Sequence, residues 1–548
     1  MTGVGDWIAR RGALACAIGV CGWTRLLSVL FLSLPSIALA QAPSGPWTRA
    51  EATDFVETST YDDVLTFLDV LERAEPRIRL GSFGYSYEGR RLPLAVWGAP
   101  AATPEAVRST GKTRVLVLAN IHAGEVEGKE ASLALLRELS GGGHAAWADS
   151  LVLLFAPIYN VDGNERVRLD NRPLQLGPVG GMGQRPNAQG FDLNRDYMKL
   201  DTPEARSLVR LFTDYDPHAT IDLHTTNGTY HGYHLTYSPP LHPGTDRDIA
   251  AFARDRWLTT AEELEPEWSM WHYGNLPRDE GVDAAPGWYT FSHQPRFGNN
   301  YAGLRNRFGL LSEAYSYLPF EDRIAVTRDF VVLLLDFAVA HASDIRRLSD
   351  AADGRDLSGE ELPVRAEHAC GEEVEILMGE VATERHPYTG EPMLRRLDVQ
   401  RPERMPDCTM FRGTETSLVP AAWLVPPALE TAIERLAAHG IRFESLPEAL
   451  EMDVEAFAIA SSTASEREFQ GHRERTLEGR WASVRETIPA GTVIVPTAQP
   501  LGRLAFYLLD PRSEDGLVAW NVLDDALEGA ARYPILRAAS PPESSHRE

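Results

Sequence analysis

Four short apolar runs, each followed by a turn or a helix-like segment, limit the folds that this chain can adopt. They cover residues 114–119, 151–158, 219–223 and 307–312. Short, unbroken apolar runs of this kind are typical of strands that are buried on both faces. Segments with apolar residues at helical spacing lie between them, as over residues 126–139. We therefore predict an α/β fold, in which helices cover both faces of a sheet.

A change of composition divides the chain after the last of these helices. Residues 349–359 are polar and lack periodicity, so we interpret them as a linker. Beyond the linker, one helix-like segment at residues 428–439 alternates with strand-like runs at residues 373–376, 421–425, 493–495 and 504–508. We predict a first domain over residues 41–348, a second, β-rich domain over residues 360–540 and a disordered tail over residues 541–548.

Residues 1–40 have the pattern of a secretory signal peptide. Arg10 and Arg11 supply positive charge, residues 26–34 are almost wholly apolar, and residues 38–40 match the small-x-small cleavage pattern. We expect an exported protein, periplasmic or secreted, whose signal is either cleaved or retained as an anchor. No other stretch reaches about 18 uninterrupted apolar residues, so membrane contact is expected only through this segment.

The charge balance excludes some partners. The chain of 548 residues has 53 Lys and Arg against 78 Asp and Glu, a formal net charge of −25. Nucleic acids and anionic membrane surfaces require a basic face, so we expect neither as a partner. Without the signal, Cys370 and Cys408 remain, and in an exported protein they either form one disulfide or stay as two buried thiols.

Two of the predicted strands end at side chains that can bind a metal ion. His122 and Glu125 follow the run at residues 114–119, and His224 ends the run at residues 219–223. Ligands gather at the carboxyl ends of parallel strands. Three protein ligands with an open fourth position are typical of a catalytic zinc site, whereas structural zinc sites have four.

Polar side chains that suit peptide chemistry follow other predicted elements. Asn194 and Arg195 stand together after a long glycine-rich loop, a combination that suits the binding of a carboxylate. Arg185 lies nine residues before Asn194. Glu313 follows the fourth predicted strand, where a carboxylate without a functional role is uncommon because its burial is costly.

Taken in order, these motifs resemble the zinc carboxypeptidase family, the carboxypeptidase A-like metallopeptidases. They are His122-x-x-Glu125, Asn160-x-Asp162-Gly163, Asp192-Leu193-Asn194-Arg195, Asp222-Leu223-His224 and Ser312-Glu313. The resemblance covers about residues 50–345, and the whole chain resembles large exported members of bacterial type that have a C-terminal accessory domain. It implies a mixed, mostly parallel sheet.

The resemblance also implies roles for single residues. One Zn²⁺ would be held by His122, Glu125 and His224, and Glu313 would be the catalytic base. Arg185 would polarise the scissile carbonyl, while Asn194 and Arg195 would bind the terminal carboxylate of a peptide substrate. The family has a tyrosine on a mobile loop, for which Tyr289 and Tyr301 are both candidates. Arg296 either favours an acidic substrate side chain or is a surface or ion-paired arginine.

Four functions follow from these predictions. The first is a carboxypeptidase that removes a C-terminal residue with metal-activated water. The second is an amidase that cuts peptidoglycan-derived peptides, which suits an exported chain, and the third is an N-acyl amino acid deacylase, which Asp222-Leu223-His224 also resembles. The fourth is a binding protein that has lost zinc, against which the intact ligands and Glu313 argue.

Overall fold

The computed structural model of the chain describes residues 45–264, 266–280 and 284–540. The signal peptide predicted over residues 1–40 and the tail predicted over residues 541–548 lie outside these ranges. A search of the described residues finds no helix that is both long and apolar enough to span a membrane.

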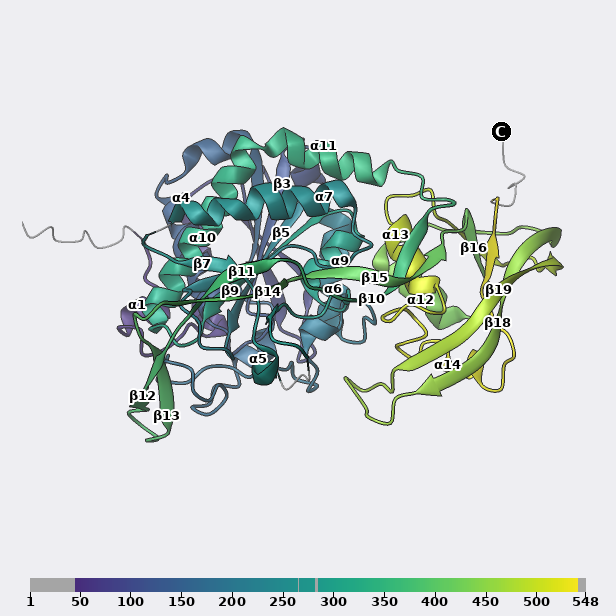
Figure 1. Cartoon of the computed structure of the whole chain (residues 1–548). Helices are drawn as coiled ribbons and strands as arrows, with labels where there is room; N and C mark the ends of the chain where they lie inside the picture. The colour runs from purple at the N-terminus through teal and green to yellow at the C-terminus, as the bar shows by residue number, and fades with distance from the viewer. Residues whose placement is uncertain (1–44, 265, 281–283, 541–548) are drawn as a thin grey trace, which may run out of the picture. The chain divides into compact units, whose positions relative to one another are not determined.

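An eight-stranded mixed sheet organises the first part of the described chain (Figure 1). In spatial order its strands are β1 (Ile78–Tyr85), β2 (Arg91–Trp97), β4 (Leu151–Ala156), β3 (Thr113–Ala119), β5 (Ala219–Thr226), β9 (Phe308–Tyr315), β6 (Leu235–Ser238) and β7 (Met270–His272). The four central strands are parallel, whereas β2 runs antiparallel to β4 and β6 runs antiparallel to β9. The predicted mixed, mostly parallel sheet is thus confirmed.

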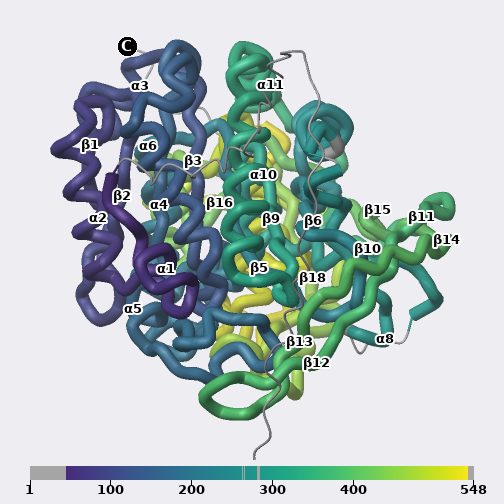
Figure 2. The backbone as a smooth tube through the Cα atoms, turned by 90° about the vertical axis from the view of Figure 1, so that its left-hand side faces the viewer, coloured from purple at the N-terminus to yellow at the C-terminus, as the bar shows by residue number. Residues whose placement is uncertain are grey.

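The central strands are apolar because both faces of the sheet are covered. Every residue of β3, β4 and β5 is buried. Helix α4 (Glu127–Ser140) packs against β3 and β5, and α10 (Phe320–Ala340) packs against α4, as Figure 2 also shows. Helix α9 (Gly298–Leu304) contacts β5 and β9. Strands covered in this way have continuous apolar sequences rather than alternating ones.

Short helices fill the connections between these elements. They are α1 (Arg49–Ala52), α2 (Tyr61–Ala74), α3 (Pro104–Arg108), η1 (Ala145–Asp149), α5 (Val161–Asn164), η2 (Leu193–Arg195), α6 (Pro203–Tyr215), α7 (Arg247–Phe252), the π-helix η3 (Ala253–Trp257), η4 (Leu258–Leu264), α8 (Pro277–Glu280) and α11 (Ala342–Asp353). The helices α2 and α6 begin at Thr60 and Thr202, whose hydroxyls accept hydrogen bonds from backbone N–H groups of the first turn.

The second part of the described chain is rich in β-strands, as predicted. One six-stranded sheet contains β16 (Ala422–Val425), β17 (Glu444–Ser445), β18 (Leu450–Ala464), β19 (Arg475–Ile488), β20 (Val493–Pro496) and β21 (Leu536–Ala538), and β18 and β19 form its long hairpin (Figure 1). Smaller sheets contain β10 (Glu361–Ala369), β11 (Glu373–Met378), β12 (Val381–Arg385), β13 (Pro392–Arg396), β14 (Arg401–Cys408) and β15 (Met410–Leu418), and β14 also pairs with β8 (Trp288–Tyr289) from the first part of the chain. Helices α12 (Glu430–His439), α13 (Gly502–Leu509) and α14 (Asp524–Leu527) complete this region.

Two predictions about this region were wrong in part. Residues 504–508, predicted as a strand, lie in α13, all of whose residues are buried. A short apolar run without polar positions does not distinguish a buried helix from a buried strand. Part of the predicted linker is also helical, because α11 continues to Asp353 with Ser349 and Ala352 buried. The boundary between the two predicted domains remains a prediction.

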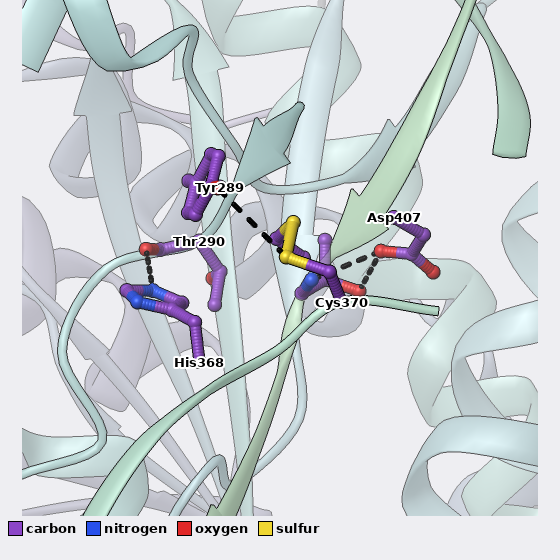
Figure 3. The surroundings of a disulfide bond; sticks show 7 residues. Tyr289, Thr290, His368, Cys370 and Asp407 are labelled. Atoms are coloured by element: carbon purple, nitrogen blue, oxygen red, sulfur yellow. Dashed lines mark hydrogen bonds between the residues drawn. A yellow bond between two sulfur atoms is a disulfide. The ribbon is translucent and has the colours of Figure 1, made fainter. Parts of the chain in front are cut away.

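A disulfide and a strand pairing connect distant parts of the chain. Cys370 and Cys408 are bonded to each other, which selects one of the two alternatives for these cysteines. Cys408 ends β14, and β14 pairs in parallel with β8 through Trp288 and Tyr289. Figure 3 shows Tyr289 beside the disulfide, with its hydroxyl 3.8 Å from the sulfur of Cys370.

Candidate metal centre

The turn after β3 carries two of the predicted metal ligands. Asn120 has a positive φ of 64°, which asparagine tolerates better than most residues, and it turns the chain away from the strand. Its carbonyl oxygen accepts a hydrogen bond from the backbone N–H of Asn160 at 3.1 Å. Its side-chain amide donates to the carbonyl of Glu125 at 3.3 Å. These bonds fix the turn that holds His122 and Glu125.

Two glycines allow other loops to approach this turn closely. A Cβ atom on Gly124 would lie 2.8 Å from the Arg172 side chain and from the carbonyl oxygen of Gly183. A Cβ atom on Gly183 would lie 2.7 Å from the carbonyl oxygen of Ala123. Only glycine fits such close backbone contacts, so the loop around residue 183 can pack directly on the ligand turn.

The three predicted ligands meet at the carboxyl ends of β3 and β5. One ligand atom from each of His122, Glu125 and His224 lies within 4.8 Å of the other two, and all three side chains are buried. The two carboxylate oxygens of Glu125 each face an imidazole Nδ1, at 3.0 Å from His122 and 3.0 Å from His224. The donor atoms therefore converge on one point, as a shared cation requires.

The outer nitrogens of both histidines face carboxylates. The Nε2 atom of His122 lies 3.0 Å from Asp192, and the Nε2 atom of His224 lies 3.1 Å from Asp222. Carboxylate partners of this kind fix the ring orientation and the tautomer of metal-binding histidines. Both imidazoles are therefore held with Nδ1 toward the centre.

Glu125 also contacts Arg172, which the sequence analysis did not single out. The guanidinium donates to Glu125 at 2.8 Å. Burial alone would raise the pKa of Glu125, but His122 and Arg172 outweigh this effect and hold the pKa well below its usual range. Glu125 is therefore ionised, as a metal ligand must be. Arg172 lies in a loop with several other arginines, and no spacing signal distinguishes it from them.

Asp192 connects the metal centre to Arg185. Its second carboxylate oxygen accepts two hydrogen bonds from the Arg185 guanidinium, at 3.0 and 2.9 Å. The same guanidinium lies 3.6 Å from Glu125. Burial would raise the pKa of Asp192, yet His122 and Arg185 hold it well below its usual range. A fixed positive charge thus stands beside the three ligands.

Asn194 and Arg195 lie on the short helix η2, next to the metal centre. The side-chain oxygen of Asn194 accepts a hydrogen bond from the backbone N–H of Gly298 at 3.0 Å. The Arg195 guanidinium lies 3.9 Å from the centre of the Phe297 ring and donates to the carbonyl of Asn194. Burial lowers the pKa of Arg195 to about 10, so the group stays charged at neutral pH. Among the described residues, no carboxylate forms an ion pair with it.

Glu313 enters the site from the neighbouring strand. On β9 it is the register partner of His224 on β5, so both side chains leave the sheet on the same face. Burial raises the pKa of Glu313 to about 8, and the positive charge of His224 opposes this rise only in part. A carboxyl group with a raised pKa, close to the metal ligands, suits proton transfer near neutral pH.

These side chains line one cavity of about 370 Å³. The cavity brings together His122, Glu125, Arg185, Asn194, Arg195, His224 and Glu313, which the sequence analysis selected, with Arg172, Thr225, Thr226, Asn227, Tyr273, Phe291, Ser292, Phe297, Asn299 and Leu311, which it did not. Tyr273 directly follows the short edge strand β7 and belongs to no motif, so nothing in its sequence context indicated it.

Three predicted substrate contacts are placed elsewhere. Tyr289 lines a second, neighbouring cavity, and Tyr301 is fully buried with its hydroxyl 2.7 Å from His439. Arg296 does not line the metal cavity. Its guanidinium is buried and bound to Asp515 and Glu474, which matches the ion-paired alternative for this residue.

The donor set and its surroundings fit zinc. Two imidazole nitrogens and one carboxylate, with a cavity on the remaining side, match the three-ligand form of a catalytic zinc site. The carboxylates behind both imidazoles supply the outer support that such sites have. The fold and this centre together define a metallohydrolase of α/β type.

Comparison with known proteins agrees with this class. Residues 64–292 match the family model of zinc carboxypeptidases. Carboxypeptidase 2 from Trichophyton equinum is 25% identical over 488 residues, which cover 82% of this chain and 81% of the fungal protein. Carboxypeptidase D from Mus musculus is 32% identical over 160 residues, 24% of this chain and 11% of the mouse protein. Over residues 64–292 the chain is therefore similar to the zinc carboxypeptidase family.

The resemblance to solved structures is weaker. A metallo-carboxypeptidase from Burkholderia cenocepacia aligns with 51% of this chain and 69% of its own chain, at 17% identity and a TM-score of 0.38. A score of this size carries no argument, so the similarity to zinc carboxypeptidases depends on the sequence matches.

Proposed function

We propose that this protein is an exported, zinc-dependent carboxypeptidase that removes the C-terminal residue of a peptide. The observation that carries the proposal is the Arg195 guanidinium, which is charged, lines the metal cavity and forms no carboxylate ion pair among the described residues. A partly buried cation that forms no direct ion pair is costly, and a substrate carboxylate would reduce that cost.

Zinc in this site would be held by His122, Glu125 and His224, where it would act as a Lewis acid and lower the pKa of a bound water. The remaining chemistry belongs to the chain. Glu313 takes a proton from the attacking water, whose oxygen bonds to the scissile carbonyl carbon. The same carboxyl group then gives that proton to the amine nitrogen as the C–N bond breaks.

Two arginines divide the negative charge of the substrate between them. Arg185 lies beside the metal ligands, so its guanidinium stabilises the oxygen on which charge develops. Arg195 and Asn194 lie on η2 and bind the terminal carboxylate, which fixes the peptide with its last bond at the metal centre. Arg195 and Asn194 thus form a carboxylate clamp, and its position beside the metal centre determines that a single C-terminal residue is removed from the peptide.

The proposal is tested with pairs of peptides that differ only at the C-terminus. We expect the free acid to be hydrolysed at least a hundredfold faster than the C-terminal amide. Arg195→Ala should reduce that ratio to nearly one, whereas Arg210→Ala, a matched change on the surface of α6, should leave it intact. Equal rates on acid and amide by the wild-type protein would contradict the carboxylate clamp.

Export and zinc content are proposed together. The disulfide between Cys370 and Cys408 supports an oxidising compartment, and the predicted signal over residues 1–40 agrees with it. We expect one zinc ion per chain, measured by elemental analysis of the purified protein. N-terminal sequencing of protein from cell fractions tests export, and a cytoplasmic protein with an intact first 40 residues would contradict it.

A further inference from the structure

Both carboxylate oxygens of Glu125 have a hydrogen-bond donor besides the two histidine rings. The Arg172 guanidinium donates to Oε1 at 2.8 Å, and the backbone N–H of Thr225 donates to Oε2 at 3.1 Å. Thr225 directly follows His224 on β5, so its donor is part of the sheet. Arg172 instead comes from the loop between α5 and η2, 47 positions after Glu125. The orientation of this ligand carboxylate therefore depends on a side chain from outside the sheet.

The ligand turn has no side chain at the place where Arg172 lies. A Cβ atom on Gly124 would lie 2.8 Å from both Cγ and Cδ of Arg172, which is too close for a real side chain. Because residue 124 is glycine, the aliphatic part of Arg172 lies directly on the turn and its guanidinium reaches Glu125. The Arg172 side chain is 13% exposed and the Glu125 side chain 3% exposed, so the pair is shielded from solvent. Removal of one partner from such a pair leaves an uncompensated buried charge.

Arg172 differs from the two other arginines of the metal cavity. Arg185 is hydrogen-bonded to a carboxylate outside the three ligands, and Arg195 forms no ion pair with a carboxylate among the described residues. Arg172 has Glu125 as its carboxylate partner, and its Nε donates to Gln175 of the same loop at 3.3 Å. These two bonds fix the guanidinium on the ligand rather than direct it toward a substrate.

Strand β13 of the β-rich region holds the loop that carries Arg172. The backbone N–H of Leu394 on β13 donates to the carbonyl of Leu174 at 2.9 Å, and the same loop residue forms a parallel β-bridge with β13. On the other side, the fully buried Arg323 of α10 donates to the carbonyl of Leu176 at 3.0 Å. Strands β12 and β13 form a separate hairpin (Figure 1), and within the described chain none of its residues lines either cavity.

We propose that Arg172 is a positioning residue that holds Glu125 in the orientation in which it binds the metal, and that β13 keeps the loop of Arg172 in place. The inference rests on the proposed zinc site of His122, Glu125 and His224. It gives the β12–β13 hairpin a role in the metal centre, although the hairpin itself lies outside the metal cavity. Partners that orient a metal ligand contribute about 10–100-fold to metal affinity or activity.

The main test measures metal binding without any substrate. Metal-free wild-type and variant proteins are titrated with Zn²⁺ against a competing chelator. We expect Arg172→Met, which removes the charge, to weaken zinc binding at least tenfold, and Arg172→Lys, which keeps the charge, to lose less. If Arg172→Met does not fold, Arg172→Gln replaces it with the same expected loss. The matched control is Arg168→Met in the same loop, where the side chain is 68% exposed, and its zinc affinity should stay within twofold.

Two further measurements distinguish positioning from substrate contact and from general support of the fold. In cobalt-loaded protein the visible absorption spectrum depends on the arrangement of the ligands, so Arg172→Met should change it and Arg168→Met should not. At saturating zinc, kcat should fall in Arg172→Met while KM stays within twofold, because Arg172 holds a ligand and not the peptide. A raised KM with unchanged zinc affinity and spectrum would overturn the proposal and assign Arg172 to substrate binding.

The role of β13 is tested at the hydrogen bond from Leu394 to Leu174. Leu394→Pro removes the donor and should weaken zinc binding at least threefold. Leu394 faces Thr383 across the hairpin, and opposite residues of an antiparallel pair direct their N–H groups alike, so the N–H of Thr383 also points away from its partner strand. Thr383→Pro is therefore the matched control, and its zinc affinity should not change. An unchanged affinity in Leu394→Pro would overturn the role of β13.

These measurements separate the inference from the proposed function. Zinc binding that weakens in Arg172→Met, in proteins that hydrolyse no peptide, would support the positioning role and overturn only the carboxypeptidase. Peptide hydrolysis by the wild-type protein, together with unchanged zinc binding and an unchanged cobalt spectrum in Arg172→Met, would overturn the positioning role and leave the carboxypeptidase standing.

Discussion

The metal centre and the β-rich wall behind it are built in different ways. His122, Glu125, His224 and Glu313 stand at the ends of neighbouring parallel strands, so the order of the sheet alone brings them together. The wall of the second cavity contains residues of β8, β10, β15 and β19, and these strands belong to three different sheets. Local sequence therefore indicates the first region, whereas the second depends on pairing between distant segments.

The difference between the two regions would be lost if the metal centre did not need the ligands at its strand ends. In His122→Ala only Glu125 and His224 remain, and two ligands hold zinc poorly. We expect stoichiometric zinc to be lost, together with all measurable peptide hydrolysis. Elemental analysis after dialysis and a hydrolysis assay measure both. His144→Ala, at a histidine outside the cavity, is the control, and full zinc occupancy in His122→Ala would remove this residue from the site.

The next largest effect is expected at Glu313, which lies in the same cavity without being one of the three converging ligands. Glu313→Gln keeps the size of the side chain and removes its basicity. We expect kcat to fall by about 10²–10⁴-fold while one zinc per chain is retained. The matched control is Glu321→Gln on the exposed face of α10. Loss of zinc from Glu313→Gln would instead assign this residue to metal binding.

The sequence predicted the ligands well because each one follows a continuous apolar strand. It did not predict Arg172, whose partner Glu125 lies 47 positions away, because side-chain pairing across loops has no periodicity. Residues 504–508 were assigned to a strand because an apolar run buried on all sides looks the same in either conformation. Arg296 was considered for substrate binding because its partners Asp515 and Glu474 lie about 180 to 220 residues further on.

One hydrogen bond connects the β-rich region with the metal centre. Gln470, in the loop of the β18–β19 hairpin, accepts a hydrogen bond from the backbone N–H of Asp192 at 2.9 Å. Asp192 supports both His122 and Arg185. Removal of a carboxylate that supports a metal ligand costs about 10–100-fold in metal affinity or activity. Gln470 contacts such a carboxylate and no metal ligand, so its loss should cost less.

We therefore expect Gln470→Ala to weaken zinc binding and kcat/KM by about threefold, below the range for a direct partner. Titration in zinc buffers and steady-state kinetics measure the two effects. Gln400→Ala, at an exposed glutamine, is the matched control. If Gln470→Ala changes neither quantity, the β-rich region does not support the metal centre through this contact.

The smallest effect on the metal chemistry is expected from the disulfide, which lies beside the second cavity. Cys408 ends β14, and its carbonyl accepts a hydrogen bond from the backbone N–H of Thr290, which lines that cavity. The bond closes a loop of 38 residues, so its loss from the double variant Cys370→Ser and Cys408→Ser should lower the free energy of unfolding by about 2–4 kcal/mol.

The double variant should keep most of its activity, because the disulfide holds Thr290 and Tyr289 rather than the ligand turn. We expect kcat/KM for a peptide with a free C-terminal carboxylate to change less than twofold. Chemical denaturation and a hydrolysis assay measure stability and activity separately. A larger loss of activity would mean that the disulfide supports the metal centre itself, and the two regions would then not be separable.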